Sequence, residues 1–190
     1  MPSPLAHVGL ALVLTAACRP RVAFVDRANW RLRGGVFAVV SVAAIAPDFD
    51  VFLAAALPGG MAWHHGPTHS VLGAAVLGYG LAKFGRLKRL DAALSVAAAV
   101  THVALDWSTG APGAPVAFGV PIFWPASDQR FMDAKPWFGA FGIHRPGFLA
   151  HMFTRDAWPI YGRELLTVLG ATLLVWPLRA WHLRTRNRAP

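Results

Sequence analysis

Five stretches of the chain are apolar almost throughout, and short polar or basic segments separate them. They cover residues 5–18, 34–57, 70–84, 91–107 and 165–181. An α-helix needs about 20 apolar residues to cross the hydrocarbon layer of a bilayer, with roughly 17–25 the usual range. The second run exceeds this length, the fourth and fifth are adequate, and the first and third are short. We therefore predict an all-α membrane bundle of four to five transmembrane helices, with five preferred.

The composition agrees with a membrane protein. The 190 residues are 55% hydrophobic and only 14% charged, with a mean hydropathy of +0.44. An ordinary soluble domain contains about 25% charged residues, so a soluble fold is a poor fit, and disorder needs the opposite balance. The length suits a single domain. The one cysteine, Cys18, excludes an internal disulfide framework and any metal site built from several cysteines.

The basic residues indicate how the predicted helices are oriented. Three clusters, which follow the first, third and fifth apolar runs, contain 13 of the 18 Lys and Arg. With five spans these clusters lie on one side of the membrane, which the positive-inside rule makes cytoplasmic. The N-terminus is then outside, and residues 182–190 form a basic cytoplasmic tail.

The net charge of +9 does not require a nucleic-acid partner. Its basic residues are divided among short segments beside the predicted spans, whereas a nucleic-acid site needs them on one face. Anionic lipid headgroups are the simpler partner for such segments. We therefore expect membrane lipids as partners and no nucleic acid.

Residues 108–162 differ in character from the rest of the chain. They contain seven prolines and many aromatic residues, so one continuous helix is excluded. Irregular backbone exposed to lipid is not viable inside the hydrocarbon layer, so we expect the segment to cover the outer end of the bundle. It is either an aromatic belt at the interface or a cap that admits an amphiphilic substrate.

Two local features of the third apolar run have structural explanations. Ala74, Gly78 and Ala82 are four residues apart, which places them on one helix face where a neighbouring helix can approach closely. Ser70 is expected to cap the start of this helix rather than act as a nucleophile.

Ionisable residues are costly in or beside membrane spans, and this chain gathers several at the predicted outer end. They come from four separate segments: His7; Asp48 and Asp50; His64, His65 and His69; His102 and Asp106. Seven of the eight histidines lie on that side, although His144 and His151 fall in the irregular segment and are expected to be surface residues. The sequence thus brings imidazoles and carboxylates to one membrane face.

The spacing of these residues suggests how they could converge. His102 and Asp106 are four residues apart, so they share one helix face and could bind one cation, or simply hydrogen bond to each other. Asp48 and Asp50 point in different directions on a regular helix, but Pro47 interrupts the span before them. The broken backbone could aim both carboxylates at one centre, or leave one as a ligand and the other orienting a histidine. Asp48 could instead cap the helix after the break.

Imidazoles and carboxylates without thiolates suit Zn²⁺, and also Mn²⁺ or Fe²⁺. The number of donors could hold one or two ions. The chemistry would be metal-assisted hydrolysis, in which the cation activates water and stabilises charge on a phosphoryl or acyl oxygen. A remaining Asp or His would act as general base.

The order of these motifs resembles a known family. An N-terminal histidine in a short apolar run is followed by Pro47-Asp-x-Asp50, by His64-x-Gly-x-Thr-His-Ser70 and by His102-x-x-Leu-Asp106-x-x-Thr109. This pattern is similar to the YdjM-like family of inner-membrane metal-dependent hydrolases, and distantly to zinc-dependent phospholipase C. The match runs from His7 to about Pro125, roughly two-thirds of the chain.

The resemblance implies a location in a bacterial-type inner membrane and a set of functional positions. The implied metal ligands are His7, Asp48, Asp50, His64, His69, His102 and Asp106. Asp48, Asp106 and His65 are the implied catalytic residues. His65 is a departure, because the family usually has Arg there; it would bind a phosphate less firmly than Arg, or add a ligand.

The leading hypothesis is therefore a membrane-embedded metal-dependent hydrolase that acts on a phosphoester or related bond of a lipid or amphiphile at the outer face. Two alternatives are a metal-binding or transport protein without hydrolytic chemistry and a structural membrane protein. Transport is disfavoured because the predicted cytoplasmic halves contain few polar residues.

Overall fold

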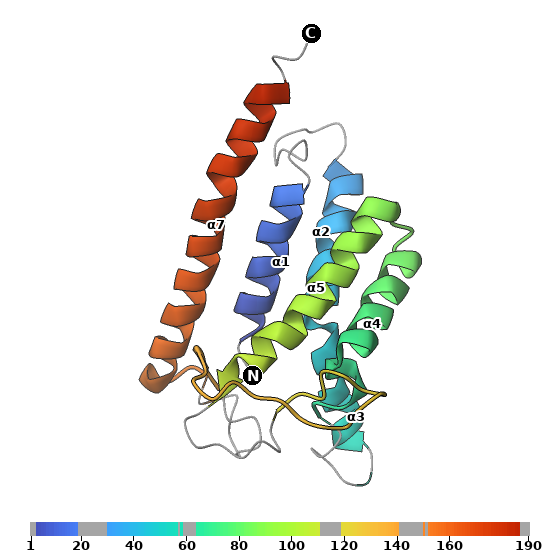
Figure 1. The fold of residues 1–190 in the computed structure, drawn as a ribbon, viewed down its shortest axis with the longest axis vertical. Coiled ribbons are helices and arrows are strands. Elements are labelled where there is room, and N and C mark those ends of the chain that lie inside the picture. Colours follow the sequence, from blue (N-terminus) through green and yellow to red (C-terminus); the bar gives the residue numbers. More distant parts are fainter. Residues whose placement is uncertain are drawn as a thin grey trace.

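The computed structural model shows five long helices that run side by side in a bundle (Figure 1). It describes residues 3–18, 30–56, 58, 64–110, 119–140, 150 and 152–186. The long helices are α1 (Pro4–Cys18), α2 (Trp30–Ile45), α4 (Val71–Phe84), α5 (Arg89–Trp107) and α7 (Trp158–Arg186). The prediction of an all-α fold is confirmed, and each of the five apolar runs lies in or overlaps one of these helices.

The second apolar run is interrupted where the sequence predicts a break. Helix α2 ends at Ile45, a 3₁₀ turn η2 (Ala46–Phe49) follows, and a short helix α3 (Asp50–Ala56) begins directly after it. Pro47 lies at the start of η2, where its ring disfavours helical geometry for the preceding residue. The break places Asp48 inside the 3₁₀ turn and Asp50 at the first position of α3.

A second 3₁₀ turn, η4 (Pro67–His69), leads into α4. Ser70 caps this helix as predicted: its hydroxyl accepts a hydrogen bond from the backbone N–H of Gly73 at 2.9 Å. The same hydroxyl donates to the carbonyl of Pro67 at 2.7 Å. The cap therefore fixes η4, and with it His69, against the first turn of α4.

Small residues fill the contacts between the helices. Ala74, Gly78 and Ala82 are all buried, so the predicted close-packing face of α4 is confirmed. A Cβ atom at Gly78 would lie only 2.7 Å from the carbonyl oxygen of Ser95 on α5, and the Ser95 hydroxyl donates to the carbonyl of Gly78 at 2.8 Å. Close backbone approach with a polar contact is typical of helices that pack in lipid, where hydrophobic attraction between helices is weak.

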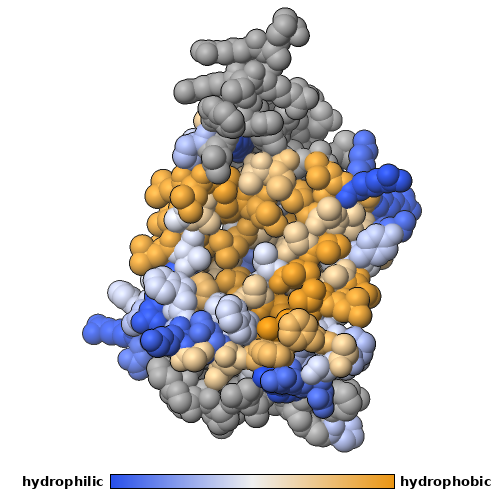
Figure 2. All heavy atoms as spheres, in the orientation of Figure 1, coloured by the Kyte–Doolittle hydropathy of each residue, from blue (hydrophilic) through white to orange (hydrophobic). Residues whose placement is uncertain are grey.

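The outer surface carries large apolar side chains, whereas small residues fill the core. Large side chains on α7 face outward: Leu166 is 65% exposed, Leu173 and Leu174 are each 73% exposed, and Trp176 is 63% exposed. Figure 2 shows apolar surface across the middle of the visible face, with hydrophilic side chains toward its ends. A monomeric soluble protein rarely exposes so extensive an apolar surface, so contact with lipid accounts for it best.

Two described segments are long and apolar enough to cross a membrane, Gly35–Phe52 and Arg89–Trp107. Helices α1 and α4 are apolar but only 15 and 14 residues long. Helix α7 has 29 residues, yet it does not meet the same criterion of length and hydropathy. Four to five crossings therefore remain a prediction.

The proline-rich segment lies at the end of the bundle where α5 stops and α7 starts (Figure 1). Of its described residues, 119–140 are irregular apart from an isolated bridge between Val120 and Phe131 and a two-residue strand β2 (Phe138–Gly139), which pairs in parallel with β1 (Thr109–Gly110). After a 3₁₀ turn η6 (Arg155–Ala157), α7 begins at Trp158, so the irregular segment ends earlier than the predicted residue 162. Pro159 is compatible with the helix because a first-turn residue has no intrahelical N–H bond to lose. Residues 182–186 likewise continue α7.

Candidate metal centre

Four side chains from three elements place one donor atom each around a common point at the end of the bundle. Asp48 comes from η2, His69 from η4, and His102 and Asp106 from α5. Nε2 of His69 lies 3.4 Å from Oδ1 of Asp48 and 3.2 Å from Oδ2 of Asp106. Nε2 of His102 lies 3.3 Å from the same Asp48 oxygen, 3.1 Å from the same Asp106 oxygen and 3.3 Å from Nε2 of His69. We call these four donors the tetrahedral site.

The spacing of the four donors fits a tetrahedral cation. In a regular tetrahedron, an edge of about 3.3 Å puts the centre about 2.0 Å from every vertex, which is the length of zinc bonds to imidazole nitrogen and carboxylate oxygen. Five of the six donor-to-donor distances are 3.1–3.4 Å, close to such an edge, and all four donors lie within 4.8 Å of one another. The donor set also suits Mn²⁺ and Fe²⁺, which accept the same ligand types with more coordination positions. The residues therefore fit the cation that the sequence predicts.

The two histidines of the tetrahedral site are oriented by partners on their other ring nitrogen. Nδ1 of His102 donates to the carbonyl oxygen of Ala44 at 2.7 Å. Nδ1 of His69 lies 3.2 Å from Oδ2 of Asp50. Since both partners are acceptors, Nδ1 carries a hydrogen in each ring, and Nε2 is the nitrogen that faces the common point and could bind a cation. Such partners fix the ring and raise the basicity of the ligating nitrogen.

Asp50 does not supply a donor to the tetrahedral site. One of its oxygens accepts from Nδ1 of His64 at 2.6 Å, and the other accepts from the hydroxyl of Thr68 at 3.1 Å and faces His69. The two readings that the sequence leaves open are thereby distinguished: Asp48 faces the common point, and Asp50 orients a histidine. Asp48 does not act as a helix cap either, because it lies inside η2.

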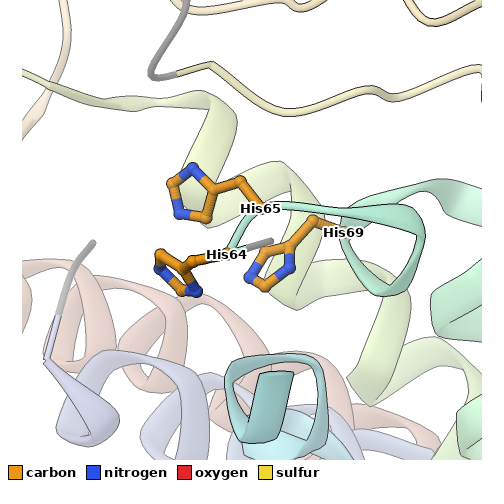
Figure 3. Close-up of side chains that lie close together, drawn as sticks. All are labelled: His64, His65 and His69. Atoms are coloured by element: carbon orange, nitrogen blue, oxygen red, sulfur yellow. The ribbon is translucent and has the colours of Figure 1, made fainter. Parts of the chain in front are cut away.

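The loop before α4 brings three imidazoles close together, those of His64, His65 and His69 (Figure 3). Of these, His69 belongs to the tetrahedral site. The ring centroids of His64 and His65 are 4.3 Å apart, and those of His65 and His69 are 4.7 Å apart. His65 adopts a left-handed backbone conformation, with φ of 57°, which costs a non-glycine residue about 1–2 kcal/mol. This conformation places Nε2 of His65 3.9 Å from Oδ2 of Asp106.

The surroundings shift the pKa values of the two loop histidines in opposite directions. Burial lowers the pKa of His65 to about 3, although the Asp106 carboxylate opposes this shift. For His69, burial also favours the neutral ring, but the carboxylates of Asp106, Asp48 and Asp50 outweigh it and raise the pKa well above its usual value. The carboxylates of the site therefore stabilise the protonated form of His69.

His7 lies at the edge of the site, in the first turn of α1. Its ring stacks on that of His102, with centroids 4.0 Å apart and an angle of 20° between the planes. Its Nε2 is 3.9 Å from Oδ1 of Asp106, too far for a hydrogen bond. His7 is thus brought to the site as the sequence predicts, but outside the tetrahedral set.

The comparison with known proteins agrees with the motifs of this site. The sequence model of the YdjM inner membrane protein family matches residues 1–185. The chain belongs to the YdjM inner membrane protein family. No curated protein and no solved structure matches it. The resemblance stated from the motifs is confirmed, and family membership together with the apolar surface establishes a membrane protein.

For this YdjM family member, the structure brings all eight predicted site residues to one end of the bundle. The two weaker candidates, His144 and His151, lie outside the described residues. Sequence reasoning missed two contributors, the Ala44 carbonyl and the Thr68 hydroxyl. A carbonyl gives no signal in a sequence.

Proposed function

We propose that this chain is a polytopic membrane hydrolase that uses a divalent cation to cleave a phosphoester or related bond in a lipid or another amphiphile. The observation that carries the proposal is a set of four donor atoms within 4.8 Å of one another, with five of their six mutual distances between 3.1 and 3.4 Å. Two imidazoles and two carboxylates in this arrangement, each histidine with an acceptor behind it, are a ligand set rather than a random polar cluster.

Zinc is the cation that the tetrahedral spacing favours, with manganese and iron as alternatives. When bound, such a cation acidifies water and stabilises negative charge on a phosphoryl or acyl oxygen. Asp48, His69, His102 and Asp106 hold it, and Asp50 and the Ala44 carbonyl keep the two imidazoles in the ligating orientation.

The open side of the site is defined by two side chains. The Asp48 side chain is 13% exposed and the His65 side chain 12% exposed, whereas the side chains of His69, His102 and Asp106 are fully buried. Water and substrate therefore approach past Asp48 and His65. One of these two groups accepts the proton of the attacking water, since no other polar side chain of the eight is both near the donors and open to solvent on that side.

Aromatic residues beside the ligands support an amphiphilic substrate. Phe49, between the two aspartates, is 48% exposed; Trp107, next to Asp106, is 42% exposed; and Phe52, in α3, is 72% exposed. Exposed rings at the membrane boundary bind the apolar part of a lipid while its headgroup reaches the polar site. A phosphodiester in a lipid headgroup combines an anionic reacting group with such an apolar part.

The proposal includes five crossings, with the metal centre at the outer face. The basic turn between α4 and α5, with Lys83, Arg86, Lys88 and Arg89, lies at the end of the bundle opposite the centre (Figure 1). The positive-inside rule puts that turn in the cytoplasm, so the N-terminus is outside and the C-terminus inside.

A second candidate function is a metal-binding membrane protein without catalysis. It is favoured by the number of protein donors, because four ligands complete a tetrahedron and leave no open position, as in structural zinc sites. Under this alternative the cation ties η2, η4 and α5 together.

Metal analysis and a hydrolysis assay on the full chain in detergent separate these functions. We expect bound zinc, manganese or iron, and release of a labelled headgroup from at least one member of a phospholipid panel. Asp106→Ala should abolish both, and Asp128→Ala, at an exposed position of the cap, should change neither. Bound metal without hydrolysis of any lipid would favour the non-catalytic function, and a metal-free protein would contradict both.

A further inference from the structure

His7 is a buried polar side chain without a polar partner. It is fully buried, and neither of its ring nitrogens has a hydrogen-bond partner among the described residues. A buried polar atom left unpaired costs about 1–3 kcal/mol, and such a group in a native fold indicates a water molecule or an ion that completes it. Its stacking on His102 holds the ring in place, so the ring cannot turn away to find another partner.

The nearest acidic atom to His7 belongs to Asp106. Oδ2 of Asp106 is a donor of the tetrahedral site, whereas Oδ1 lies 3.9 Å from Nε2 of His7. Two atoms this far apart do not hydrogen bond, but both can bind one cation, because bonds of about 2.0–2.2 Å to each span such a distance. Oδ2 of Asp106 thus faces His69 and His102, and Oδ1 faces His7.

We propose that a second divalent cation binds between Nε2 of His7 and Oδ1 of Asp106, so that the Asp106 carboxylate bridges two cations. This inference rests on the proposed function and deepens it. Carboxylate-bridged pairs about 3.5–4 Å apart are a recurrent arrangement in enzymes that hydrolyse phosphoesters.

The charge of the site favours a cation over a water molecule at this position. Asp48, Asp50 and Asp106 carry three negative charges within a few ångströms of one another. One divalent cation in the tetrahedral site balances two of them, which leaves a negative charge in the low-dielectric interior of the bundle. This remaining charge attracts a cation to Oδ1 of Asp106, whereas a neutral water molecule would leave the charge uncompensated.

The second cation also resolves the difficulty of a closed tetrahedral site. Four protein donors fill the coordination of the first cation, so it has no position for water or substrate. A cation held by only His7 and Asp106 keeps positions for both. His7 and Asp106 would hold the second cation, and it would supply the open coordination positions that the tetrahedral site lacks.

The test is the metal content of the full chain in detergent, measured after loading with Zn²⁺ and dialysis. We expect two zinc ions per chain in the unaltered protein and one in His7→Phe, which keeps a flat ring against His102 but removes both nitrogens. Asp128→Ala, in the exposed part of the cap, should retain both ions. Thermal unfolding of the metal-free variants shows whether each is folded, and His7→Leu replaces His7→Phe if that variant is not.

Loading with Mn²⁺ provides a second readout that does not depend on activity. Two Mn²⁺ ions that share a carboxylate give an exchange-coupled electron paramagnetic resonance spectrum, and His7→Phe should give the spectrum of an isolated ion. One ion per chain in both proteins would overturn the second cation and leave the proposed function standing. Two ions in both would show that His7 is not a ligand and would also overturn it. No bound ion in either would overturn the second cation and the proposed function together.

Discussion

At the scale of single residues, the candidate metal centre depends on acceptors that are not themselves among the four donors. Asp50 accepts from His64 and Thr68 and faces Nδ1 of His69, so one carboxylate sets the orientation of a ligand and of the loop around it. His102 has the simpler arrangement, with the Ala44 carbonyl behind its ring. The difference matters experimentally, because a side-chain acceptor can be changed by mutation and a carbonyl cannot.

Asp50→Asn should weaken metal binding without abolishing it. The amide cannot accept from His64, His69 and Thr68 as the carboxylate does, so the His69 ring loses its fixed tautomer and orientation. Loss of such a partner typically lowers metal affinity about 10–100-fold. Competition with a chelator of known affinity measures the change, and Asp128→Asn is the exposed control. Asp48→Asn changes a proposed metal ligand and serves as the comparison. If Asp50→Asn lost as much metal affinity as Asp48→Asn, Asp50 would be a direct ligand.

At the scale of elements, the site is assembled by short breaks in otherwise regular helices. The two 3₁₀ turns, η2 and η4, carry Asp48 and His69 toward α5, where His102 and Asp106 project from one helix face. Each turn is fixed by local chemistry: Pro47 at the start of η2, and the Ser70 cap after η4. These elements connect the sequence motifs to the geometry of the donors.

Gly73→Ala should disturb η4, whereas Gly80→Ala in the same helix should not. A Cβ atom at position 73 would lie 2.0 Å from the carbonyl oxygen of Pro67, and at position 80 it would meet nothing within 4 Å. The first substitution must displace η4 and with it His69, at a cost of several kcal/mol if the turn cannot shift. The second should be neutral or stabilise the helix by up to about 1 kcal/mol.

The unfolding temperature in detergent and the zinc affinity are measured for both glycine variants and compared. The expected pattern is a lower unfolding temperature and weaker zinc binding for Gly73→Ala alone. Equal behaviour of the two variants would show that η4 is not held against the first turn of α4.

Glu164 is a buried carboxylate that supports the start of α1 from α7. Its Oε1 accepts from the backbone N–H of Ser3 at 2.6 Å, and its Oε2 accepts from the Ser3 hydroxyl. Glu164→Ala should lower stability by about 1–3 kcal/mol, since a buried N–H then lacks its acceptor. A double-mutant cycle with Ser3→Ala in thermal unfolding gives the coupling between the side chains. Additive effects would mean that the two groups do not act together.

The elements show which parts of the site the sequence could predict. The i, i+4 spacing of His102 and Asp106, the break at Pro47 and the cap at Ser70 are local signals, and each appears in the structure. The division of roles between Asp48 and Asp50 stayed open, because the direction of a side chain in a 3₁₀ turn depends on what packs around it. The pairing of Ser3 with Glu164 joins residues 161 positions apart, and no local pattern predicts it.

At the scale of the whole molecule, hydrophobicity and charge are arranged as a membrane requires. Small side chains and polar contacts lie between the helices, large apolar side chains face outward, and the basic turn and the metal centre lie at opposite ends. The sequence predicted this arrangement from its runs and clusters. It did not define the number of crossings, because α1 and α4 are shorter than a typical span and their insertion depends on the helices beside them.

The orientation can be tested with cysteine labelling, since Cys18 is the chain's single cysteine. In a Cys18→Ser background, Asp128→Cys places a thiol in the exposed part of the cap, and Arg86→Cys places one in the exposed turn between α4 and α5. The positive-inside rule puts the basic turn in the cytoplasm, so a membrane-impermeant maleimide applied to intact spheroplasts should label position 128 and not position 86. Both should react after the membrane is permeabilised. If only position 86 were labelled in intact spheroplasts, the topology would be the reverse of the one proposed. The candidate metal centre would then lie at the cytoplasmic face, where a different pool of lipid headgroups would reach Asp48 and His65.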